Sequence, residues 1–102
     1  MVRVANLTDI VKREVAEYAW DQADSRAYFM QDEIHRAFAA LIVPVSKPQE
    51  SLAIVVAHIS DDDIVVIDTD LTDKPLFDAL LESGVPRNRI IRAYRGETTP
   101  TR

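Results

Sequence analysis

Three consecutive segments decide the fold: LAIVVAHI at residues 52–59, SDDD at 60–63 and IVVID at 64–68. Runs of β-branched residues on both sides of a short polar turn are typical of a β-hairpin. Aspartate favours such turns because its short side chain accepts hydrogen bonds from nearby backbone amides. We therefore expect Leu52–Ile59 and Ile64–Asp68 to be paired strands joined by a tight turn.

The residues before this hairpin predict one helix and two more strands. Apolar residues between Leu7 and Ala19 recur at helical spacing, which indicates an amphipathic helix over residues 8–22 with Asn6 or Thr8 as its cap. Residues 25–32 and 36–43 are then predicted to form two paired strands, because a polar turn separates them. A break at residues 47–49 leads into the central hairpin.

The residues after the hairpin predict a second helix and a last strand. Thr72 is the expected cap, Asp73 and Pro75 occupy the first turn, and Gly84 is the expected stop. Residues 89–94 are predicted to form a closing strand. The resulting order, α-β-β-β-β-α-β, indicates an α+β fold with two helices and an antiparallel or mixed sheet of about five strands.

The length of 102 residues fits one domain. We expect residues 1–95 to form it and residues 96–102 to be a flexible tail. With 47% apolar and 28% charged residues, the composition is that of a globular protein. The chain has no cysteine and no apolar run that approaches a membrane span. A cytoplasmic protein is the expectation.

Charge is distributed unevenly along the chain, whose net charge is −5. Residues 61–82 carry eight acidic side chains against Lys74 alone, whereas residues 86–102 carry five arginines against Glu97. An acidic molecule releases few counterions on nucleic acid, and this release supplies much of the affinity of DNA-binding proteins. Direct nucleic-acid binding is therefore disfavoured.

The aspartates of the hairpin turn are the main candidate for a small-ligand or metal site. Asp61, Asp62 and Asp63 could offer oxygen ligands to Ca²⁺ or Mg²⁺. The glycine and distal glutamate of a calcium loop are missing, so turn formation is the favoured interpretation. A small ligand- or divalent-metal-binding domain remains the alternative function, while no metal or other cofactor is expected.

The two histidines, His35 and His58, lie in no recognisable catalytic motif. Asp68 and Asp70 could pair as acid and base on one side of a strand, but solvent-exposed strand ends are the favoured explanation. We therefore expect the chain not to be an enzyme, with an uncharacterised small enzyme as the weaker alternative.

Five residues are candidates for binding a protein partner. Guanidinium groups suit carboxylate or phosphate recognition, and an exposed tryptophan is a frequent anchor at interfaces. The arginines could instead pair with the acidic segment or protect an edge strand, and the tryptophan could cover the core. The candidates are Trp20, Arg87, Arg89, Arg92 and Arg95.

Residues 37–45 and 52–57 are apolar on both faces of the predicted strands. Two short helices can cover only one face of a sheet, so the second face needs another cover. We expect a second copy of the chain to supply it, which predicts a homo-oligomer, most simply a dimer.

The segment LLESGVPRNRII at residues 80–91 resembles the corresponding part of the XisI family of element excision controlling factors. HISD at residues 58–61, IVVI at 64–67 and Thr72-Asp73 fit the same pattern, and the resemblance covers roughly residues 8–95. The chain departs from the family at the hairpin turn, where three aspartates replace an Asp-Gly pair.

This resemblance implies an α+β fold and a regulatory role in the site-specific excision of a DNA element. The recombinase would be a different protein, and the companion would be an XisH-like protein that is often encoded beside XisI. The resemblance implies no catalytic residues.

Overall fold

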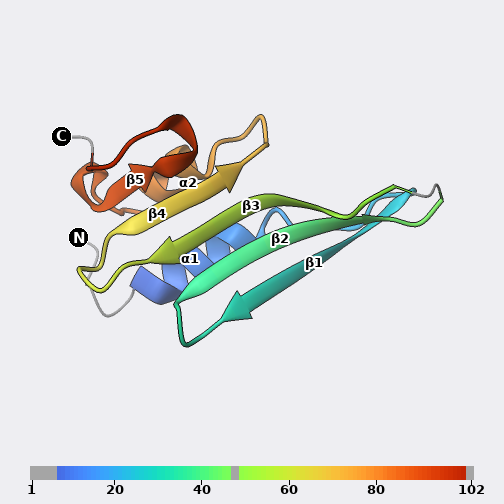
Figure 1. The fold of residues 1–102 in the computed structure, drawn as a ribbon, viewed down its shortest axis with the longest axis horizontal. Helices are drawn as coiled ribbons and strands as arrows, with labels where there is room; N and C mark the ends of the chain where they lie inside the picture. Colours follow the sequence, from blue (N-terminus) through green and yellow to red (C-terminus); the bar gives the residue numbers. More distant parts are fainter. Residues whose placement is uncertain (1–6, 47–48, 101–102) are drawn as a thin grey trace.

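The structure is a computed structural model that describes residues 7–46 and 49–100 (Figure 1). Asn6, one of the two expected helix caps, lies outside the described residues, as do the break at Lys47 and Pro48 and the end of the expected tail. The predicted element order is confirmed. The main elements are α1 (Leu7–Ala16), β1 (Ser25–Asp32), β2 (Ala37–Pro44), β3 (Leu52–Ile59), β4 (Val65–Asp70), α2 (Leu76–Glu82) and β5 (Ile90–Arg92).

The five strands form one mixed sheet in the order β1-β2-β3-β4-β5. The first four strands pair antiparallel as successive hairpins, whereas β5 runs parallel to β4. A parallel neighbour requires a crossover connection, and α2 provides it. The α+β class and the mixed sheet are therefore as expected from the sequence.

The central hairpin forms where the sequence predicts it. The Ser60 amide donates to the Ile64 carbonyl at 2.9 Å, and the Ile64 amide donates to Ser60 Oγ at 3.2 Å. Asp63 adopts a φ of 59°, in the left-handed region that aspartate tolerates better than most residues. The turn chemistry of the aspartates therefore explains their presence, and β4 then continues two residues further than predicted.

Helix α1 is shorter than the expected residues 8–22. The Tyr18 amide donates to the Val15 carbonyl and the Ala19 amide to the Ala16 carbonyl, which are the tighter bonds of a helix end. Tyr18 and Ala19 still pack against the core from this turn, so their apolar spacing continues after the helix has ended. Trp20 consequently lies beyond the helix, in the connection to β1.

Thr72 does not cap α2, and this expectation was wrong. Asp70 provides the cap instead, because its Oδ2 accepts from the Leu76 amide at 2.7 Å while its Oδ1 accepts from the Thr72 amide at 3.0 Å. The helix begins at Leu76, after Pro75. Its predicted stop is confirmed, since Gly84 has a φ of 97° and the hydrogen bonds of the following turn close a Schellman motif.

The last strand covers three residues instead of the expected residues 89–94. Short 3-10 turns flank it at Arg87–Arg89 and Ala93–Arg95. The Arg92 amide donates to the Glu97 carboxylate at 2.8 Å, which satisfies this donor without a further strand partner. Residues after β5 are thus tied back to the strand, and Gly96 supplies the left-handed turn that this requires.

Both helices cover the same face of the sheet, as Figure 1 shows. The hydrophobic core lies between them and the strands, where inward-facing residues alternate along β2, β3 and β4. Among the described residues, no helix is long and apolar enough to cross a membrane. The fully buried side chains include Val11, Val15, Val55, Val65, Ile67, Leu76, Leu80, Val85 and Ile90.

Candidate functional site

The second face of the sheet carries apolar side chains that neither of the described helices α1 and α2 covers. Strand register places Met30, Ala39 and Val56 in one row across it. Met30 is 57% exposed and Tyr28, in the next row of β1, is 52% exposed. We call this surface the open face. Its members are Tyr28, Met30, Ala37, Ala39, Leu41, Val56, His58, Val66 and Ile91.

A histidine–carboxylate pair lies within the open face, on which the register also places Arg26, Asp32 and Thr69. His58 lies between Ala37 and Val66 in the register, and its Nδ1 is 2.7 Å from Asp68 Oδ2. Asp68 sits at the irregular register step between β3 and β4. The contact pairs one polar atom of each side chain within the face, which lowers the cost of burying them against another protein.

A groove of about 1000 Å³ lies between α1, α2 and the ends of the central strands. Its apolar lining includes two of the most exposed large side chains, Trp20 at 60% and Leu71 at 61%. Ile42 and Ile54 line it as well. Large apolar side chains left open to water in one place are typical of a binding surface.

Carboxylates surround this apolar lining. Glu14 and Glu17 come from the α1 side, and Asp78 and Glu82 come from α2. Asp73 adds a fifth carboxylate, whereas Lys74 is the one basic residue among the described residues of the lining. Glu14 already makes two contacts within the chain, because it pairs with Arg13 at 3.2 Å and accepts from the Ser83 hydroxyl at 2.9 Å. We call this surface the acidic groove.

Tyr18 shows the effect of this negative potential. Burial raises the pKa of Tyr18 to about 12, and the charges of Asp70, Glu14 and Asp78 add to the shift. The hydroxyl donates to the Lys74 carbonyl, which joins the end of α1 to the segment before α2. The groove therefore disfavours added negative charge and favours positive charge.

The predicted arginines serve contacts within the chain. Arg87 and Arg92 lie over the Phe77 ring at 5.3 and 4.1 Å, and Arg92 also pairs with Glu97 at 2.8 Å. Arg89 donates to the Asp62 carbonyl at 3.1 Å. Much of the guanidinium chemistry that suggested a docking surface is thus used to attach the C-terminal segment to α2 and to the hairpin turn.

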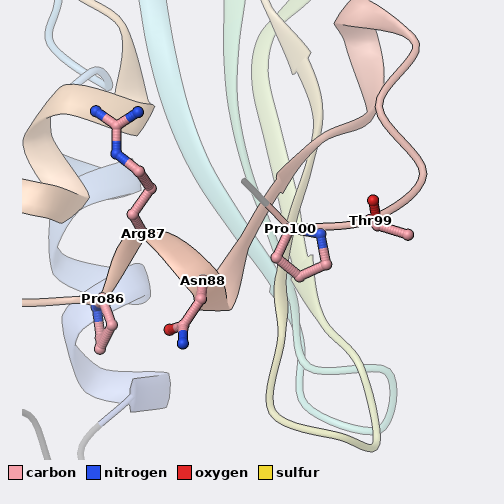
Figure 2. Close-up of a pocket in the computed structure, with 5 residues that line it drawn as sticks. All are labelled: Pro86, Arg87, Asn88, Thr99 and Pro100. Carbon is pink, nitrogen blue, oxygen red and sulfur yellow. The ribbon is translucent and has the colours of Figure 1, made fainter. Parts of the chain in front are cut away.

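Figure 2 shows the hollow beside these arginines, with the Arg87 guanidinium directed toward α2. Pro86, Arg87 and Asn88 line one side, and Thr99 and Pro100 line the other. None of these residues lines the acidic groove that contains Trp20. The structure therefore assigns Trp20 and the arginines, including the exposed Arg95, to different surfaces.

The aspartate-rich turn shows no arrangement for a cation. Asp63 pairs with Arg36 at 2.9 Å, while Asp61 and Asp62 are exposed. Within residues 7–46 and 49–100, no group of three or more His, Cys, Asp or Glu side chains is placed to hold a metal ion.

Each histidine is paired with an aspartate. His35 Nδ1 is 2.5 Å from Asp32 Oδ2 in the exposed turn between β1 and β2, and His58 pairs with Asp68 as described. Both histidines line the same shallow hollow at this end of the sheet. Asp68 and Asp70 do not form an acid–base pair with each other, because Asp70 caps α2.

Sequence reasoning missed the carboxylates of the acidic groove. They come from α1, α2 and the segments beside these helices, which are far apart in the sequence, so no local motif contains them. A signal was present, because Glu14 and Glu17 are three residues apart and Asp78 and Glu82 are four apart, which places each pair on one helical stripe.

Comparisons with known proteins identify relatives of this architecture. The family model described as XisI protein matches residues 1–101. An XisI-like protein from Anabaena variabilis ATCC 29413 has a similar structure, with a TM-score of 0.77 and 19% identity over 88% of this chain and 85% of that one. The fdxN element excision controlling factor XisI from the same organism is also similar in structure, with a TM-score of 0.72 and 17% identity over 89% of this chain and 86% of that one. No curated protein matches the chain.

Proposed function

This chain belongs to the XisI family, and we propose that it is a non-catalytic regulatory factor that controls the site-specific excision of a DNA element. It acts by binding a partner protein, an XisH-like companion. The recombinase is a separate protein.

The observation that carries this proposal is the amount of apolar surface left without cover. The open face has the composition of a buried strand surface, and the acidic groove exposes a tryptophan and a leucine. A monomeric soluble protein rarely exposes contiguous apolar patches of this kind unless they bind something. The function that fits such surfaces best is protein binding.

The charge of the chain supports an indirect action on DNA. A net charge of −5 and the carboxylates of the groove repel phosphate. Arg87, Arg89 and Arg92, which could contact phosphate, hold intramolecular contacts. We therefore propose that control of excision passes through the companion protein.

We further propose that the open face binds a second copy of the chain. Strand spacing of about 4.8 Å and a rise of about 3.3 Å per residue give four strands of six to eight residues a footprint of about 500 Å². Two such faces together bury about 1,000 Å², which is the lower limit for a specific interface. The face is mostly apolar, with the His58–Asp68 pair and three further polar residues, Arg26, Asp32 and Thr69, and such a composition is suited to packing on a second copy.

The partner surfaces are Trp20 in the acidic groove and the arginine segment of Arg87, Arg89, Arg92 and Arg95. An exposed tryptophan is the kind of residue that carries binding energy at interfaces. Arg95 is exposed in the last 3-10 turn, so it remains accessible to an acidic partner.

The test is to express the chain together with the XisH-like companion from its own genome. Size exclusion with light scattering then measures whether one species contains both chains. We expect a stable complex at micromolar concentration that Trp20→Ala or Arg95→Glu weakens. Separate elution of the two chains would contradict the proposed function.

A further inference from the structure

We propose that the acidic groove binds a basic amphipathic segment of the partner protein. The segment would place apolar side chains on Trp20 and Leu71 and lysine or arginine side chains against the carboxylates. This inference rests on the proposed function and deepens it, because the segment would belong to the companion.

The floor of the groove supplies the apolar contacts. Trp20 and Leu71 are each about 60% exposed, and Ile42 and Ile54 extend the surface below them. A partner that buries their exposed apolar area gains favourable binding free energy, because this area is removed from water. An aromatic anchor with aliphatic neighbours is the usual composition of an interface centre.

The rim supplies the specificity for positive charge. Glu17 on the α1 side and Asp78 and Glu82 on α2 are exposed, and all three line the same groove. Like charges placed close together destabilise a fold. A cationic ligand removes this cost, so the rim repels acidic segments and attracts basic ones.

The spacing of the rim residues suggests the spacing of the partner's cations. Asp78 and Glu82 are four residues apart on α2, which separates them by about 6 Å along the helix axis. Two basic residues four apart on a helical segment would match this distance. The volume of about 1000 Å³ accommodates several side chains of such a segment.

The groove contains the only tryptophan of the chain, which provides a direct reporter. The probe is a short synthetic peptide, free of aromatic residues, with lysines on one helical face and leucines on the other. We expect saturable binding that shifts the Trp20 fluorescence. A matched peptide with glutamate in place of lysine should not bind.

Variants separate this groove from general electrostatic attraction. Asp78→Lys combined with Glu82→Lys should weaken peptide binding at least about tenfold, because it reverses the charge of the rim. Asp61→Lys combined with Asp62→Lys changes the net charge equally on the hairpin turn and should leave binding nearly unchanged. Circular dichroism checks that both variants remain folded. An equal loss for the two variants, or peptide binding without a fluorescence change, would overturn the inference.

The companion complex distinguishes this inference from the proposed function. A complex that forms and dissociates with the groove variant supports both. A complex that forms and is insensitive to the groove variant overturns the inference while the proposed function stands. If the peptide binds but no complex with the companion forms, the proposed function is overturned, whereas the preference of the groove for basic segments stands. Light scattering of the chain without its companion gives a further outcome. If the groove variant has a lower molar mass than the unchanged chain there, the groove binds a second copy, which also overturns the inference.

Discussion

The two faces of the sheet have similar residues and different surroundings. On the covered face, Val55, Ala57 and Ile59 of β3 are buried beneath the helices. On the open face, Val56 and His58 of the same strand are half-buried. A strand that is apolar on both sides indicates burial on both sides. The difference shows that the described helices cover only one face of the sheet, and the proposed contact with a second copy would cover the other.

Replacing one leucine on each side of the sheet by alanine should reveal the largest difference in unfolding free energy between the two faces. Leu80→Ala removes a fully buried α2 side chain, and we expect a loss of about 3 kcal/mol of unfolding free energy. Leu41→Ala on the open face removes a half-exposed side chain and should cost less than about 1 kcal/mol in the monomer. Denaturant unfolding at low protein concentration measures both values. Equal losses would show that the open face is as well packed as the core.

A charge introduced on the open face should disrupt self-association without unfolding the chain. Met30→Lys places an ammonium group within the proposed interface, on its edge strand β1, so the dissociation constant should rise at least about tenfold, or about 1.4 kcal/mol. Light scattering over a dilution series measures this constant. Gln31→Lys is the matched control, because the neighbouring residue is also exposed but points to the other side of β1. The same response from both variants would place the interface elsewhere.

Substitution of Asp70 tests how the start of α2 is fixed on the covered face of the sheet. Asp70→Ala removes the acceptor for the Leu76 amide at the start of α2, and the expected loss is about 1 kcal/mol. Asp73→Ala changes an exposed carboxylate in the same loop and should cost less than about 0.5 kcal/mol. Thermal unfolding of the two variants provides the comparison. A larger effect for Asp73 would contradict the assignment of the cap.

The pH dependence of Tyr18 should give the smallest effect, because the side chain is partly exposed and solvent screens the charges around it. Its folded-state pKa is raised from 10.0 to about 12, so the folded state holds the phenolic proton more tightly than the unfolded state does. The corresponding stability is present below pH 10 and is lost as the pH rises from about 10 to about 12. Unfolding measured across this range should show the loss, and Tyr18→Phe should reduce it. An unchanged slope in the variant would assign the alkaline transition to other groups.

Local chemistry made much of the fold predictable. The hairpin at residues 52–68 and the stop at Gly84 depend on turn residues beside them in the sequence, and the structure confirms both. The end of α1 was not predictable, because Tyr18 and Ala19 keep helical spacing while they pack from a turn. The cap of α2 was missed since Asp70 lies six residues before the amide that it accepts from.

The candidate site was less predictable than the fold because it depends on tertiary contacts. Trp20 was identified as an interface candidate from its residue type alone. The carboxylates around it come from α1, α2 and the segments beside these helices, which only the fold brings together. Phe77 similarly holds Arg87 and Arg92, and nothing in the sequence near the arginines indicates this ring as their partner.

Fluorine NMR of the chain labelled with 5-fluorotryptophan tests the central claim most directly, because Trp20 gives a single resonance from the acidic groove. The account predicts that the unlabelled XisH-like companion shifts or broadens this resonance, and that the variant with Asp78→Lys and Glu82→Lys responds much less. A resonance that stays unchanged at saturating companion concentration would contradict the account.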